Sequence, residues 1–170
     1  MSDLKDVARA LEVEIRGLVI DPVSNSPIVI LKKPNEDVFL PIWIGVFEAN
    51  AIALELEGVQ TPRPMTHGLL RDLIVTLGAR VRSVLVHTLR ENTFLARIEL
   101  ARPDGEVVAV DARPSDAIAL ALRCRAPIRV TAEVFEAATS ASLESGANPD
   151  ERVREWLDSL SPEQLGKYRM

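Results

Sequence analysis

Four polar residues that suit phosphate chemistry fall within one short stretch of the chain: Asp111, Arg113, Ser115 and Asp116. We expect Asp111 to end a strand and Asp116 to lie in the first turn of the following helix. A strand end that meets a helix N-terminus binds anions, because free N–H groups and the helix dipole point outward. Arg113 could then clamp a phosphate through two hydrogen bonds, with Ser115 beside it. In the alternative interpretation, Asp116 only complements the dipole, and Arg113 pairs with an acid such as Asp111 to lock the loop.

A general acid or base is offered by His67, one of only two histidines. It falls in the first turn of a helix expected at 67–77, directly after a rigid loop that contains Arg63 between two prolines. A histidine held there could transfer protons near neutral pH, and Arg63 could contact phosphate. The alternative is that His67 satisfies backbone groups at the helix start. His87 falls within an expected strand, and we interpret it as structural.

The chain repeats itself at a constant spacing. The stretch 51–56 (AIALEL) returns at 117–122 (AIALAL), and at the same spacing 15–20 falls on 81–86 and 40–44 on 106–110. Such agreement over several elements predicts one strand-strand-strand-helix unit used twice. We therefore expect an α+β fold with a mixed or antiparallel sheet and packed helices, whose duplicated halves span about 12–58 and 78–124.

The repeat also predicts which polar residues meet. Asn50 corresponds to Asp116, and Glu48 corresponds to the start of the second helix, so both helices begin with polar side chains. If the two units pack together, Glu48, Asn50, Asp111 and Asp116 could face one cleft. Carboxylates are the ligands that Mg²⁺ and Mn²⁺ prefer, so Glu48, Asp111 and Asp116 would bind a divalent cation. Arg63 and Arg113 would bind phosphate.

Hydrophobic alternation, turn residues and capping signals place the remaining elements. We expect Thr66 to cap the helix at 67–77, Trp43 to lie in the core, and the chain to form these further elements: strands 12–20, 28–31, 38–44, 80–88, 93–101, 106–111 and 128–130, and helices 48–56, 114–124 and 132–138. Residues 1–138 would form one domain, 139–149 a linker, and 150–170 a short helical tail.

Composition excludes several protein classes. The apolar fraction of 47% suits a folded core, and the one cysteine permits neither an internal disulfide nor a cysteine-based zinc site. No apolar run approaches the roughly 18 residues of a membrane span, and the N-terminus does not resemble a signal peptide. We expect a cytoplasmic protein without membrane contact. The net charge of −5 is unlike that of a dedicated nucleic-acid binder, although residues 63–129 are net basic.

Four motifs occur together in a specific order: LPIWIG at 40–45, RPMTH at 63–67, TFLA at 93–96 and DARPSDAIALALR at 111–123. With this spacing the chain resembles the bifunctional nuclease domain family over roughly residues 12–138. The resemblance implies an α+β fold, a homo-oligomer and degradation of both DNA and RNA. The chain departs from the family pattern at Gly68, where an acid often follows the histidine, at Leu95 of TFLA, and at 161–165 in the tail.

Two functions remain open from the sequence. The first is a nuclease of low specificity that hydrolyses DNA and RNA, assisted by Mg²⁺ or Mn²⁺. The second is a non-catalytic oligomeric module that binds or regulates a partner. The acidic net charge and the aromatic content of only 4% favour the second, because single-stranded nucleic acids are commonly bound by aromatic stacking.

Overall fold

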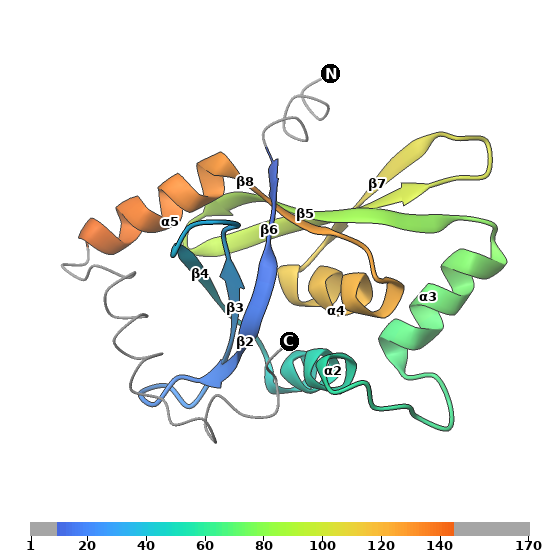
Figure 1. Ribbon diagram of the computed structural model, residues 1–170, viewed down its shortest axis with the longest axis horizontal. Coiled ribbons are helices and arrows are strands. Elements are labelled where there is room, and N and C mark those ends of the chain that lie inside the picture. The colour runs from blue at the N-terminus through green and yellow to red at the C-terminus, as the bar shows by residue number, and fades with distance from the viewer. Residues whose placement is uncertain (1–9, 145–170) are drawn as a thin grey trace.

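The computed structural model describes residues 10–144, which form two β-sheets and four helices (Figure 1). One sheet has three strands in the order β2-β3-β4, and the other has five in the order β1-β8-β5-β6-β7. The α+β class expected from the sequence is confirmed. None of the helices in this part of the chain combines the length and the apolar character that crossing a membrane requires.

The first unit is an antiparallel meander followed by a helix. It comprises β2 (Glu14–Ile20), β3 (Pro27–Lys32), β4 (Phe39–Trp43) and α2 (Val46–Leu56). Asp21 shapes the first hairpin turn, since its carboxylate accepts hydrogen bonds from the Val23 amide and the Ser24 hydroxyl. Gly58 ends the helix with a φ of 66°, a left-handed conformation that glycine adopts without strain.

The second unit repeats this order. It comprises β5 (Arg80–Arg90), β6 (Thr93–Ala101), β7 (Val107–Ala112) and α4 (Pro114–Cys124). The three strands again pair as an antiparallel meander. β8 (Ile128–Thr131) adds to β5 in parallel, and β1 (Ala10–Glu12) pairs with β8 on the outside. The predicted duplication of a strand-strand-strand-helix unit is therefore confirmed.

Helix α4 is the centre of the core and lies between the five-stranded sheet and α2 (Figure 1). Its residues 117–121 (AIALA) have no solvent exposure at all. The alanines bring the backbones of the two repeated helices close together, while Ile118 and Leu120 fill the remaining space. Pro114 starts the helix where a missing N–H costs nothing, and Arg125 ends it in a left-handed conformation.

Two further helices complete the described chain. α3 (Thr66–Thr76) joins the two units and contacts α4 and β5. α5 (Ala132–Glu144) follows β8 and packs against β5 and β8. The helix expected to end near 138 therefore continues to Glu144, because the small polar residues after 138 contain no glycine or proline that would break it before that point. The rest of the expected linker and the tail at 150–170 lie outside the described residues.

Two local predictions were wrong. Thr66 does not cap α3, because it is already the first helical residue; Met65 takes the cap position and makes no side-chain cap. Trp43 is not a core residue, since 55% of it is exposed and its indole N–H donates to Asp21. Strand periodicity places Trp43 on the opposite face from its buried neighbour Ile42, which explains the second error.

We expect Ile118→Ala to lower the free energy of unfolding by about 2–5 kcal/mol, because a fully buried isoleucine loses both its transfer energy and its packing. Urea denaturation followed by circular dichroism measures the change. Val23→Ala is the matched control, since Val23 is 93% exposed, and it should alter stability by less than about 0.5 kcal/mol. Equal effects of the two substitutions would contradict the central position of α4.

Candidate active site

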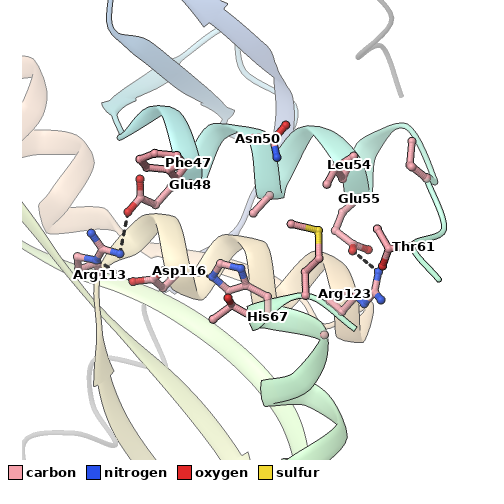
Figure 2. A pocket seen from close by; sticks show the side chains of 15 residues that line it. Phe47, Glu48, Asn50, Leu54, Glu55, Thr61, His67, Arg113, Asp116 and Arg123 are labelled. Atoms are coloured by element: carbon pink, nitrogen blue, oxygen red, sulfur yellow. Dashed lines mark hydrogen bonds and ion pairs between the residues drawn. The ribbon is translucent and has the colours of Figure 1, made fainter. Parts of the chain in front are cut away.

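A cavity of about 360 Å³ lies where α2, α4 and the start of α3 meet (Figure 2). The loop between α2 and α3 closes one end of it. The side chains that line the cavity come from these four segments and are Phe47, Glu48, Asn50, Ala51, Leu54, Glu55, Val59, Thr61, Met65, Thr66, His67, Gly68, Arg113, Asp116 and Arg123. Glu48 and Arg113 lie at one end of the cavity and Glu55 and Arg123 at the other (Figure 2). The lining also includes apolar side chains, so the cavity suits a ligand with both characters.

Arg113 links two carboxylates at one end of the cavity. Its Nε donates to Asp116 Oδ2 at 2.7 Å, and its Nη2 lies 2.9 Å from Glu48 Oε1. Arg113 immediately precedes α4, so its backbone is still extended and its side chain can reach α2. The hydrogen bond and charge of Asp116, with a further hydrogen bond to Glu48, raise the pKa of Arg113 above its ordinary value. The guanidinium is therefore a permanent cation that remains open to solvent.

His67 completes a chain of polar contacts with Asp116. Its Nε2 lies 3.1 Å from Asp116 Oδ1, so the two oxygens of this carboxylate bind different partners. An ionised carboxylate only accepts hydrogen bonds, which assigns the imidazole proton to Nε2. In the neutral form of the ring, Nδ1 is then the acceptor. Asp116 thus fixes both the orientation and the tautomer of His67.

The charge state of Asp116 follows from opposing influences. Burial alone would raise its pKa, but hydrogen bonds from Arg113 and His67, together with the positive charge of Arg113, outweigh burial and lower the pKa below the ordinary value. Asp116 is therefore ionised at neutral pH. It cannot donate a proton to a leaving group, and its contribution is to hold its two partners in place.

A second ion pair closes the opposite end of the cavity. Arg123, at the end of α4, donates through Nη1 to Glu55 Oε1 on α2 (Figure 2). Gly68 is buried against this guanidinium, and a Cβ at that position would lie 3.1 Å from Arg123 Nη2. The lack of a side chain at Gly68 thus lets the guanidinium lie close to the start of α3.

Five of the residues expected at the site do line one cavity: Glu48, Asn50, His67, Arg113 and Asp116. Sequence reasoning missed Phe47, Glu55 and Arg123. One signal pointed to Glu55: it lies seven residues after Glu48 and so shares one face of α2 with it. A partner for Glu55 sixty or more positions away along the chain could not be read from that spacing.

Three expected site residues lie elsewhere. Asp111 on β7 pairs in register with Arg97, so both project from the same face of the sheet. Their neighbours Ala96 and Ile98 belong to the core around α4, and strand alternation therefore turns Asp111 away from α4 and the cavity. Ser115 is buried behind the cavity lining, and the exposed Arg63 is also outside that lining.

The carboxylates expected to bind a cation are thus not gathered in one place. Within residues 10–144 no three His, Cys, Asp or Glu side chains are grouped so that they could hold a metal ion. Glu48 and Asp116 both bind Arg113 instead, so a guanidinium lies between them where a Mg²⁺ or Mn²⁺ ion was expected. The donor set does not fit the predicted three-carboxylate site, and the cation requirement stays a prediction.

Comparison with known proteins gives a match to one family and to several relatives, in agreement with the resemblance found in the sequence. A sequence model of the bifunctional nuclease domain matches residues 29–142. An uncharacterized protein of Mycobacterium tuberculosis (strain ATCC 25618 / H37Rv) is 42% identical over 164 residues, covering 89% of this chain and 96% of that protein. Bifunctional nuclease 2 of Arabidopsis thaliana is 31% identical over 108 residues, covering 62% of this chain and 33% of its own length. Bifunctional nuclease 1 of Oryza sativa subsp. indica is 27% identical over 116 residues, covering 67% and 35%.

We expect Asp116→Asn to make the free energy of unfolding depend less on pH below neutrality. A carboxylate whose pKa is lowered by folding stabilises the protein above its unfolded pKa, near 3.8, and that contribution disappears as the pH falls through the lower folded value. Urea denaturation between pH 7 and pH 3 measures the free energy of unfolding of both proteins. The difference in this free energy between wild type and variant should become smaller below about pH 4. Asp111→Asn, which removes an exposed carboxylate outside the cavity, is the control. Parallel profiles for wild type and Asp116→Asn would contradict the assignment.

Proposed function

Since this chain belongs to the bifunctional nuclease domain family, we propose that it hydrolyses phosphodiester bonds of DNA and RNA in the cavity between α2, α3 and α4. One observation carries the proposal. A base, the acid that orients it and a phosphate-binding cation form a continuous chain, His67–Asp116–Arg113, although they come from two separate helices and a loop. Each of the three has a role in phosphodiester hydrolysis.

His67 is the proposed general base. With its proton on Nε2, held by Asp116, the ring would accept a proton through Nδ1 from a water molecule bound in the cavity. His67 takes a proton from that water as its oxygen bonds to phosphorus. The bond to the leaving ester oxygen breaks, and that oxygen receives a proton from the imidazolium or from solvent. The reaction consumes one water and leaves a phosphate monoester and a hydroxyl group.

Arg113 is the proposed phosphate ligand. Two of its nitrogen atoms already bind carboxylates, which hold the guanidinium at the cavity, and its other N–H groups remain as donors. These donors would neutralise charge on the non-bridging oxygens as it increases in the transition state. Glu48 restrains Arg113 from α2, so that the cation stays over the start of α4.

Low specificity is consistent with this arrangement. Contacts to phosphate position a nucleic acid without reading its bases, and the charged residues of the cavity suit phosphate better than base edges. A mechanism that uses water as the nucleophile does not need the 2′-hydroxyl that distinguishes RNA from DNA. The proposed substrate class therefore includes both polymers.

The alternative is a binding module without catalysis. This alternative is supported by the charges of the lining. Three carboxylates, those of Glu48, Glu55 and Asp116, outnumber two guanidinium groups, so the cavity attracts a polyanion only weakly. Activity of the purified protein distinguishes the two functions, because a binding module would leave labelled strands intact.

We expect His67→Ala and Asp116→Asn to lower the rate of hydrolysis of labelled single-stranded DNA and RNA by roughly 10²- to 10⁴-fold, as for the loss of a positioned base. Arg113→Ala should also lower it. Matched controls are His87→Ala, which removes the other histidine, and Asp111→Asn, which lies outside the cavity. Each assay is run with Mg²⁺, with Mn²⁺ and with EDTA, which tests the expected cation. Equal degradation by wild type and all variants would indicate a contaminant and contradict the site.

We also propose that the protein is a homo-oligomer whose subunits meet through α3. Of the eleven residues of this helix only Gly68 is buried. One side of α3 and Leu77, the residue that follows the helix, expose a leucine face formed by Leu69, Leu70, Leu73 and Leu77. The leucine face has no charged member, so it complements a second copy of itself better than it would a charged partner. Burial of this face against a second subunit would further stabilise a helix that has only one buried residue of its own.

Leu73→Glu should convert the oligomer to a monomer, because it places a carboxylate in the centre of the leucine face. Multi-angle light scattering after size-exclusion chromatography measures the mass. Val75→Glu is the control, since Val75 is exposed on another side of α3. A monomeric wild-type protein, or an unchanged mass in Leu73→Glu, would contradict this interface.

A further inference from the structure

Phe47 presents an aromatic ring to solvent at the rim of the cavity. It is 89% exposed, although it is a large apolar residue in the first turn of α2. Figure 2 shows it beside Glu48, the residue that holds Arg113 from α2. The ring is thus next to the place where a phosphate would bind.

The fold itself gives no reason for a phenylalanine at this position. Phe47 belongs to neither cluster of packed apolar residues, and phenylalanine is a poor helix former compared with alanine. Isolated exposed apolar side chains are common on proteins, so exposure alone means little. Its position at a cavity that also contains a phosphate-binding cation is the feature that requires an explanation.

The interior of the cavity continues this apolar surface. Ala51 and Leu54 follow Phe47 on α2 by four and seven residues, and Val59 and Met65 add further apolar side chains to the lining. A nucleotide has the same division, with a charged phosphate at one end and a flat apolar base at the other. Phosphate at Arg113 would place the attached sugar and base within reach of Phe47 and of this apolar lining.

We propose that Phe47 stacks on the base next to the cleaved phosphate, so that the substrate is an unpaired nucleotide of single-stranded DNA or RNA. This inference rests on the proposed function. A base inside a duplex is already stacked on both sides and cannot accept a protein ring without leaving the helix.

A cavity of 360 Å³ is also at the small end of ligand sites, which span about 300–1,000 Å³, and does not admit a duplex. Stacking is tolerant of sequence because every base has a flat face, in agreement with low specificity.

The test measures binding, independently of cleavage. Fluorescence anisotropy in EDTA gives the affinity of the full-length protein for a labelled single-stranded oligonucleotide and for an abasic strand of equal length and charge. We expect Phe47→Ala to weaken binding of the base-containing strand by roughly 5- to 100-fold, as is found for the loss of one stacked base. Binding of the abasic strand should stay unchanged, and Phe47→Trp should retain the affinity of wild type. Duplex DNA of the same sequence should bind more weakly than the single strand.

Val46→Ala is the matched control, because Val46 is a neighbouring apolar residue that is 67% exposed and does not line the cavity. It should leave both affinities unchanged. An equal loss on the two strands, no loss in Phe47→Ala, or an altered oligomer mass in that variant would each overturn the stacking role. If Phe47→Ala weakens binding only of the base-containing strand, while neither wild type nor any variant cleaves, the proposed hydrolysis fails and the stacking role of Phe47 stands.

Discussion

The close packing of α2 against α4 is the constraint on which the site depends. Alanines in the repeated sequence let the two helix backbones approach, and the helices run side by side in the same direction. Their charged residues therefore meet twice, Glu48 with Arg113 near the start of both helices and Glu55 with Arg123 near their end. A larger side chain in place of the buried alanines would separate the helices and, with them, both ion pairs.

The duplication supplies the framework, but the chemistry comes from what is not duplicated. Asn50 and Asp116 occupy equivalent positions, yet only Asp116 has an arginine and a histidine as partners. The histidine is contributed by α3, which contacts α4. At the spacing of the repeat α3 falls on α5, but α5 packs against β5 and β8 instead, so the repeated scaffold carries an asymmetric site.

Charge at the site is balanced locally. Asp116 is ionised because two donors stabilise its charge against partial burial, and Arg113 stays protonated because two carboxylates surround it. This balance keeps the three side chains in one arrangement without a bound ligand, which favours a site organised before its substrate arrives. A phosphate would bind the N–H groups of Arg113 that the two carboxylates leave free, beside their negative charge, so the apolar part of the cavity would contribute to any affinity for nucleic acid.

The sequence by itself determined the order of elements, the duplication and the family, because periodicity, turn residues and repeated motifs are local properties of the chain. The repeat also indicated Glu48, Asn50 and Asp116, since it predicts that both helix starts meet. His67 and Arg113 were indicated by their places at the expected starts of two helices. Only the tertiary structure decided which polar residues actually reach the cavity. Strand alternation shows that Asp111 and its neighbours point to opposite faces, but not which face α4 covers, and the pairing of Glu55 with Arg123 arises from helix packing that no short-range pattern encodes.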